Sequence, residues 1–466
     1  MQITVRVDNM LRLKKQEVPD EVIKKLETKF VFPNPKWLEN EKRGYWTGNI
    51  PKTLKFIHIK GGQISIPRGL SSWCIRFLGS MGFKVVLDDR TRKLPDVDFK
   101  FQASLRPFQD KAVAAILSRR FGVLNAPTGS GKTVMALKVI AERKQPALVI
   151  VHTKELLYQW RDKVVDFLGL PQEEIGLIGA GKKQVGALIT IAIVNSLYKC
   201  LKEVKENIGF LVVDECHRTP ARTFTEAVEA LDSMYMLGLS ATPYRRDGLT
   251  KVIHFYLGNT VYDITPRELQ RQNQIMSAKL VVRKTGFDYD YQDDYQEMIS
   301  SLVEDSDRNN MIARDVADYT AKELGIALVL SERKSHCQTL LDLIFKNNVT
   351  CRLLTGDVST VERKAIVEEL NQSKVRALVA TSQLVGEGFD LKELSSIFMA
   401  TPVRFSGRVK QYIGRILRMT KRKTEAFIYD YLDKPGVLIA SFKNRVHVYR
   451  ELGVPVDEQT SFLWDL

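Results

Sequence analysis

A glycine-rich segment, Ala126-Pro-Thr-Gly-Ser-Gly-Lys-Thr133, follows the apolar pair Val123-Leu124 and precedes apolar residues at helical spacing. Gly129 and Gly131 let the backbone curl so that its N–H groups face phosphate oxygens, and the dipole of the following helix favours the same negative charge. Lys132 is expected to reach β- and γ-phosphates, and Thr133 a magnesium ion. The predicted phosphate-binding residues are Pro127, Thr128, Gly129, Ser130, Gly131, Lys132 and Thr133.

A second segment, Phe210-Leu-Val-Val-Asp-Glu-Cys-His217, ends an apolar strand with two adjacent carboxylates. Ligands of open α/β sheets collect at the carboxyl ends of the strands, which places Asp214 beside the phosphate loop. Asp214 is expected to hold Mg²⁺, and Glu215 to orient and deprotonate an attacking water. Alone, such a pair is more often a helix cap, but the phosphate loop favours ATP hydrolysis. His217 fits a coupling role, and a buried, hydrogen-bonded histidine is the alternative.

A third segment, Gln411-Tyr-Ile-Gly-Arg-Ile-Leu-Arg418, spaces Gln411, Arg415 and Arg418 at i, i+4 and i+7. On a helix this spacing shares one face, which would present two guanidinium groups to one γ-phosphate. A basic helix facing solvent is the alternative. Because these residues lie far along the chain from Lys132, ATP would have to draw two parts of the chain together, and its hydrolysis would act as a switch.

Two sets of short apolar runs must position these groups, and they alternate with stretches of helical period, such as 334–345. Continuous apolar strands of this kind indicate parallel sheets covered on both faces, and therefore two α/β lobes. An acidic stretch within residues 283–300 is interpreted as a solvated linker between them. The predicted domains are 1–95, 96–283 and 284–466. The predicted strands are 147–151, 188–194, 210–213, 234–239, 326–330, 349–354, 375–380, 396–399 and 426–431.

The composition is that of an ordinary globular protein: 466 residues, of which 44% are apolar and 27% charged, so disordered and fibrous classes are excluded. No apolar run reaches the roughly 18 residues of a membrane-spanning helix, and the first residues do not resemble a secretory signal. Five scattered cysteines without a CxxC pair suggest a reducing compartment. We therefore expect a cytoplasmic protein.

Charge is unevenly distributed along the chain, whose formal net charge is +15. The first 100 residues contain 20 Lys or Arg against 11 Asp or Glu, together with Trp37, Trp46 and Trp73. Basic and aromatic groups in this mixture suit phosphate neutralisation and base stacking. A small domain whose aromatic residues simply form its core is an equally good interpretation.

The segment Asp214-Glu215-Cys216-His217 resembles the DExH box of superfamily 2 helicases and translocases. Further motifs of that superfamily occur in the expected order. The sequence after the third of them, Ala241-Thr-Pro-Tyr-Arg-Arg-Asp-Gly248, is similar to the XPB-like and phage UvsW-like DNA helicases. The matching segments are 105–109 (LRPFQ), 151–157 (VHTKELL), 240–242 (SAT), 379–390 (VATSQLVGEGFD) and 411–418 (QYIGRILR).

This resemblance implies two tandem RecA-like parallel-sheet lobes behind a small basic N-terminal α+β domain, with ATP and Mg²⁺ as cofactors. It implies adenine recognition by Arg106 and Gln109, further nucleotide contacts at Gly388 and Asp390, and a relay from Ser240 and Thr242 to the acidic box. The implied contacts to a nucleic-acid backbone are Thr153, Lys154, Ser196, Thr355, Gly356 and Thr381. A helix-cap or turn role suits each of these hydroxyls equally well.

The resulting prediction is a monomeric, ATP-driven DNA helicase that unwinds or branch-migrates forked or branched DNA in replication, recombination or repair. Family resemblance adds 3′→5′ tracking. A double-stranded DNA translocase that does not separate strands is one alternative, and an RNA-stimulated ATPase is another. A phosphate-loop switch without motor activity is disfavoured because it would leave Arg415 and Arg418 unexplained. No nuclease activity is expected.

Overall fold

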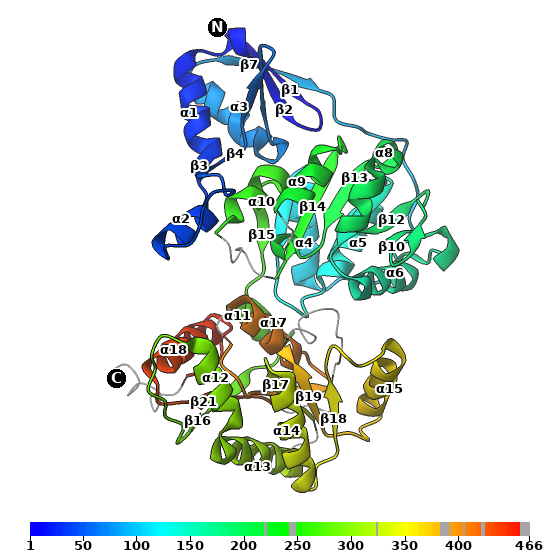
Figure 1. The fold of residues 1–466 in the computed structure, drawn as a ribbon. Coiled ribbons are helices and arrows are strands. Elements are labelled where there is room, and N and C mark those ends of the chain that lie inside the picture. Colours follow the sequence, from blue (N-terminus) through cyan, green and yellow to red (C-terminus); the bar gives the residue numbers. More distant parts are fainter. Residues whose placement is uncertain are drawn as a thin grey trace. The chain divides into compact units, whose positions relative to one another are not determined.

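The structure is a computed structural model, and it describes residues 1–218, 221–241, 248–322, 325–382, 391, 393–403, 406–420 and 425–456. The chain divides into two compact units (Figure 1). The first consists of Met1–Ala126 and Gly131–Asp263, and the second of Pro127–Ser130 and Ile264–Leu466. Within the described residues, none of the helices combines the length and the apolar character needed to cross a membrane.

The N-terminal part of the first unit has its own five-stranded sheet, in the order β5-β6-β2-β1-β7. The β1–β7 pair is parallel and the other neighbours are antiparallel. A separate antiparallel pair, β3 (Val31–Pro33) and β4 (Thr53–Lys55), lies outside it. The sheet strands and helices are β1 (Gln2–Val7), β2 (Leu11–Lys14), β5 (His58–Lys60), β6 (Gln63–Ile66), β7 (Lys84–Asp89), α1 (Asp20–Phe30), α2 (Pro35–Lys42) and α3 (Ser71–Ser80).

An eight-stranded sheet follows within the same unit, in the order β11-β10-β12-β9-β13-β14-β8-β15. Its central strands β9, β12 and β13 are buried almost throughout, as expected of parallel strands with helices on both faces. Its strands are β8 (Phe121–Asn125), β9 (Ala147–Val151), β10 (Gly176–Gly179), β11 (Lys182–Lys183), β12 (Ile189–Ile193), β13 (Phe210–Val213), β14 (Tyr235–Ser240) and β15 (Thr260–Asp263). Its helices are α4 (Pro107–Leu117), α5 (Lys132–Arg143), α6 (Lys154–Leu168), α7 (Val194–Leu197), α8 (Leu201–Val204), α9 (Ala221–Glu229) and α10 (Thr250–Leu257).

The two sheets of the first unit share one hydrophobic core, which runs from β1 to α10. The Phe30 and Phe255 rings lie 4.9 Å apart, centroid to centroid. Arg68 is buried to 1% exposure and donates hydrogen bonds of 2.8 Å to the carbonyl oxygens of Leu231 and Ser233. A Cβ at Gly69 would come within 2.6 Å of the α10 backbone. The N-terminal part is therefore in direct contact with the eight-stranded sheet and helix α10.

The second unit is built on a six-stranded, entirely parallel sheet, in the order β16-β21-β20-β17-β19-β18. Its strands are β16 (Ala278–Lys284), β17 (Ile326–Ser331), β18 (Cys351–Leu354), β19 (Ala377–Thr381), β20 (Leu394–Met399) and β21 (Ala426–Leu432). Its helices are α11 (Pro266–Arg271), α12 (Tyr295–Glu304), α13 (Ser306–Lys322), α14 (Lys334–Lys346), α15 (Thr360–Asn371), α17 (Ser406–Ile416) and α18 (Gly436–Glu451).

The predicted fold class is confirmed: each predicted apolar run overlaps an observed strand, and the two large sheets are parallel apart from the short β10–β11 pair. The linker interpretation of residues 283–300 is wrong. β16 ends within this stretch and α12 begins in it. The apolar residues Met298 and Ile299 of α12 pack with Phe287 and Leu438, so this part of the chain belongs to the second unit. The division of the chain between Asp263 and Ile264 accordingly precedes the predicted junction at 283 and 284.

Candidate active site

The phosphate loop follows β8 and opens α5, as the sequence indicated. Gly129 and Gly131 have φ angles of +89° and +84°, a left-handed conformation that residues with a Cβ rarely adopt. The Lys132 ammonium donates a hydrogen bond to the Ala126 carbonyl oxygen at 2.9 Å. This bond folds the lysine back over the loop, where its charge faces the place that the loop N–H groups would offer to phosphate.

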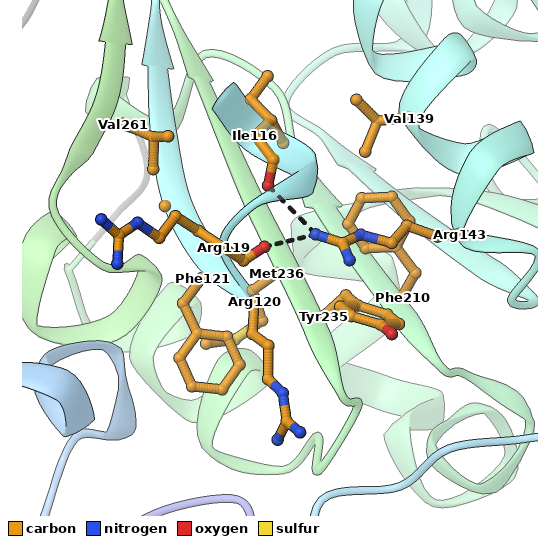
Figure 2. A pocket seen from close by; sticks show the side chains of 11 residues that line it. Ile116, Arg119, Arg120, Phe121, Val139, Arg143, Phe210, Tyr235, Met236 and Val261 are labelled. Atoms are coloured by element: carbon orange, nitrogen blue, oxygen red, sulfur yellow. Dashed lines mark hydrogen bonds between the residues drawn. The ribbon is translucent and has the colours of Figure 1, made fainter. Parts of the chain in front are cut away.

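Helix α4 holds the predicted adenine contact against the phosphate loop. Gln109 Oε1 accepts from the Arg106 N–H at 2.9 Å, and a Cβ at Gly131 would lie 2.5 Å from Gln109 Nε2. At the other end of α4, the guanidinium of Arg143, the last residue of α5, donates to the carbonyl oxygen of Ile116 at 3.1 Å (Figure 2). Figure 2 also shows it over the Tyr235 ring, 4.0 Å from the centroid. Both ends of α4 are thus tied to the loop and its helix.

The acidic box lies at the same edge of the sheet, directly after β13. Asp214 is 6% exposed; its Oδ1 accepts from the Glu215 N–H at 2.9 Å and its Oδ2 from the Trp160 indole N–H at 2.8 Å. Glu215 has a φ of +46°, unusual for a residue other than glycine. Its carbonyl oxygen is held by the Arg218 N–H at 2.8 Å and lies 3.3 Å from His152 Nε2. Two donors therefore hold the Asp214 carboxylate, and two further groups hold the backbone carbonyl of Glu215.

The two carboxylates differ in their electrostatics. Burial and repulsion from Glu215 raise the pKa of Asp214. Burial acts in the same sense on Glu215 and is the largest single influence, but Lys132 together with His217, Arg218 and His152 outweighs it and lowers the pKa of that carboxyl. Glu215 Oε2 accepts no hydrogen bond among the described residues. Adjacent carboxylates of this kind fit a hard divalent cation, which prefers oxygen ligands and offsets their repulsion.

His217 links the acidic box to β14. Its Nδ1 lies 3.0 Å from the Ser240 hydroxyl oxygen, and both side chains are buried. Burial lowers the pKa of His217 to about 4, so the ring is neutral at pH 7. Although Nδ1 is also 3.4 Å from Glu215 Oε2, a neutral ring forms no ion pair, and the contact with Ser240 is the shorter one. The predicted relay residue Ser240 therefore contacts the acidic box through His217. This contact agrees with both interpretations of His217, a coupling role and a buried, hydrogen-bonded histidine.

The arginine helix of the second unit is shorter than predicted. Gln411 and Arg415 lie on α17, at 5% and 8% exposure, but α17 ends at Ile416. Arg418 instead forms an antiparallel bridge with Ile275, because the chain has left the helix. The expectation that all three side chains share one helical face is therefore wrong for Arg418.

The candidate nucleic-acid contacts lie at the carboxyl ends of neighbouring strands. In the first unit, Thr153 and Lys154 follow β9 and Ser196 follows β12, its neighbour in the sheet. In the second unit, Thr355 follows β18 and Thr381 ends the adjacent β19, while Gly356 comes directly after Thr355. Thr153 Oγ1 accepts from the Leu156 N–H at 3.3 Å, so it is also the N-cap of α6. The topology brings each set together, and the role of these residues in binding stays a prediction.

Some predicted site residues lie outside the described part of the chain, namely Thr242, Gly388 and Asp390. Conversely, sequence reasoning missed Trp160 and His152, which contact the acidic box. The only signal in the sequence was their position after the parallel strand β9. His152 lies just before α6 and Trp160 lies within it. A residue pair separated by 54 positions cannot be read from helical or strand period.

A phosphate loop, a carboxylate pair beside it and a second parallel-sheet unit define a two-lobed P-loop ATPase. Residues 102–245 match the family described as type III restriction enzyme, res subunit, and residues 311–420 match the helicase conserved C-terminal domain. Both matches are consistent with a superfamily 2 helicase, the class that the sequence motifs resemble.

Relatives include phage and archaeal proteins. The chain is 27% identical over 347 residues to the probable helicase D10 of Escherichia phage T5, a match that covers 71% of this chain and 72% of that protein. It is 25% identical over 381 residues to the DNA 3′-5′ translocase XPB2 of Sulfurisphaera tokodaii, covering 73% and 84% respectively. It is 25% identical over 430 residues to the ATP-dependent DNA helicase uvsW of Enterobacteria phage T4, covering 84% and 83%.

The fold likewise matches solved helicase structures. The crystal structure of the Pyrococcus furiosus Hef helicase domain aligns with a TM-score of 0.51 at 15% identity. The alignment covers 73% of this chain and 98% of that one. At this identity the match concerns the fold alone, and it agrees with two tandem RecA-like sheets.

Proposed function

We propose that this protein is an ATP-driven DNA helicase that acts on forked or branched DNA. The observation that carries the proposal is the Asp214–Glu215 pair, with Asp214 buried and Glu215 partly exposed, at the sheet edge that bears the phosphate loop and under the influence of the Lys132 charge. Mg²⁺, when bound, would neutralise phosphate charge. Asp214 and Thr133 are the residues that would hold it, and Glu215 is the carboxylate placed to accept a proton from water.

The second unit supports a motor rather than a simple switch. Gln411 and Arg415 lie on a helix of a separate parallel-sheet unit, and a guanidinium group brought to the γ-phosphate would make ATP the link between the two units. Each unit also carries candidate backbone contacts at its own strand ends. Alternate gripping by the two sets would move the chain along a strand.

DNA as the substrate, and branched DNA in particular, is inferred from relatives and charge. The T4 relative is named a DNA helicase and the archaeal one a DNA translocase, and this chain has a net charge of +15. A double-stranded DNA translocase is the second candidate, since the XPB2 relative is named a DNA 3′-5′ translocase.

ATP turnover and strand separation should be measured on single-stranded, duplex, forked and four-way DNA, and on RNA. We expect DNA-stimulated turnover and ATP-dependent fork opening. Lys132→Ala should abolish both and leave DNA binding largely intact, whereas Arg415→Ala should slow turnover with little loss of ATP affinity. Displacement of a third strand without fork opening would establish the translocase. Stimulation by RNA alone would refute DNA as the substrate.

A further inference from the structure

Trp160 is the largest fully buried side chain in the first unit, and it lies on the inner face of α6 with Leu157 and Val164. Its indole N–H is its one polar group, and a buried indole N–H needs an acceptor. That acceptor is Asp214 Oδ2, 2.8 Å away. The tryptophan therefore contacts the carboxylate to which Mg²⁺ binding is assigned above.

Two hydrogen bonds determine the orientation of the Asp214 carboxylate. Asp214 Oδ1 accepts from the Glu215 N–H, a donor within the acidic box itself. The Trp160 N–H is the second donor, and it comes from a different element. Together they set the plane of the carboxylate and leave further lone pairs on both oxygens for a cation. The loss of a group that orients a metal ligand in this way typically lowers metal affinity by about 10–100-fold.

The same helix begins at the candidate nucleic-acid contacts. Thr153 caps α6, and Lys154, its first residue, is exposed. His152, immediately before the cap, lies 3.3 Å from the Glu215 carbonyl oxygen. From Lys154 to Trp160 the helix rises about 9 Å. The acidic box is therefore contacted by the residue that precedes the cap, His152, and by Trp160 in the second turn of the helix.

We propose that Trp160 is a positioning residue of the ATPase site, and that α6 transmits nucleic-acid binding at Thr153 and Lys154 to the Asp214 carboxylate. A displacement of the helix N-terminus would move the indole donor and reorient the magnesium ligand. The inference rests on the proposed function, because it concerns how that same site is regulated.

The test compares Trp160→Phe with Val164→Ala in the full-length protein. Phenylalanine keeps an aromatic ring and removes the N–H, whereas Val164→Ala removes buried volume one turn along the same face and keeps the hydrogen bond. Should Trp160→Phe fail to fold, β-(3-benzothienyl)alanine at position 160 serves instead, because sulfur replaces the N–H in the same ring shape.

Three quantities are measured: the Mg²⁺ dependence of binding of a non-hydrolysable ATP analogue by calorimetry, the Mg²⁺ dependence of turnover, and the stimulation of turnover by DNA. Trp160→Phe should raise the Mg²⁺ concentration needed in both magnesium series by about tenfold. It should also reduce the stimulation of turnover that saturating DNA produces. Val164→Ala should lower thermal stability but leave all three quantities unchanged.

Unchanged Mg²⁺ dependence in Trp160→Phe would overturn the positioning role, and equal effects of the two variants would overturn it too. A shifted Mg²⁺ dependence with full DNA stimulation would overturn the coupling through α6. Each of these three results leaves the proposed function standing, as long as the wild-type protein hydrolyses ATP and Lys132→Ala does not. Wild-type protein without turnover would refute the proposed function itself.

Discussion

Arg68→Met is expected to loosen the N-terminal part from the eight-stranded sheet. In the folded chain the Arg68 guanidinium is buried and donates to three carbonyl oxygens, those of Leu231 and Ser233 at 2.8 Å and that of Asp8 at 3.1 Å. Burial lowers the pKa of Arg68 to about 10, so the group is still charged at pH 7. Methionine retains the apolar stem but leaves these oxygens without their charged donor.

The expected size of the effect follows from the two shortest bonds. A buried acceptor that loses its partner costs about 1–3 kcal/mol, so two of them lower the free energy of unfolding by about 2–6 kcal/mol. For a unit of this size, about 1 kcal/mol shifts the melting temperature by roughly 2–4 °C. We therefore expect the transition of the first unit to fall by about 10 °C, or to split in two as the N-terminal part unfolds separately.

Differential scanning calorimetry measures this directly. Arg76→Met on α3 is the matched control, because that side chain is exposed and surface substitutions of this kind usually change stability by less than about 0.5 kcal/mol. Limited proteolysis between the two sheets should accelerate in Arg68→Met alone. If both variants melt within 2 °C of wild type, the buried arginine does not fasten the two sheets, and the argument fails.

Two other substitutions test backbone and protonation. Gly131→Ala should abolish ATP binding, because its φ of +84° disfavours a Cβ and that atom would lie 2.5 Å from Gln109 Nε2; calorimetric ATP affinity near wild type would contradict this. In the second unit, burial and the Arg308 charge lower the pKa of His336 to about 3, below its unfolded value of about 6.5. Stability contributed by the neutral ring is thus present above pH 6.5 and lost as pH falls toward 3, by about 2 kcal/mol between pH 7 and 5. In urea unfolding, the free energy of unfolding of His336→Gln should fall less between pH 7 and 5 than that of wild type, by this amount. An equal fall in the two proteins would refute the burial effect.

The local sequence determined whatever depends on residues close together in the chain. The phosphate loop, the acidic box and the parallel strands were predictable, because glycine spacing, a strand followed by carboxylates and continuous apolar runs each act over a few residues. The same local reasoning misjudged residues 283–300, where frequent acidic and aromatic side chains concealed Met298 and Ile299 on the inner face of α12. It also extended the helix of Arg415 through Arg418, which instead pairs with Ile275.

Only the tertiary structure decided which distant groups meet. Trp160 contacts Asp214, His217 contacts Ser240, and Arg68 contacts Leu231, over separations of 54, 23 and 163 positions. Hydrogen bonds between buried groups depend on how the sheets and helices pack, and no periodicity in the sequence encodes that packing. The sequence alone therefore determined the chemistry available to this protein, and the packed fold decided which side chains orient it.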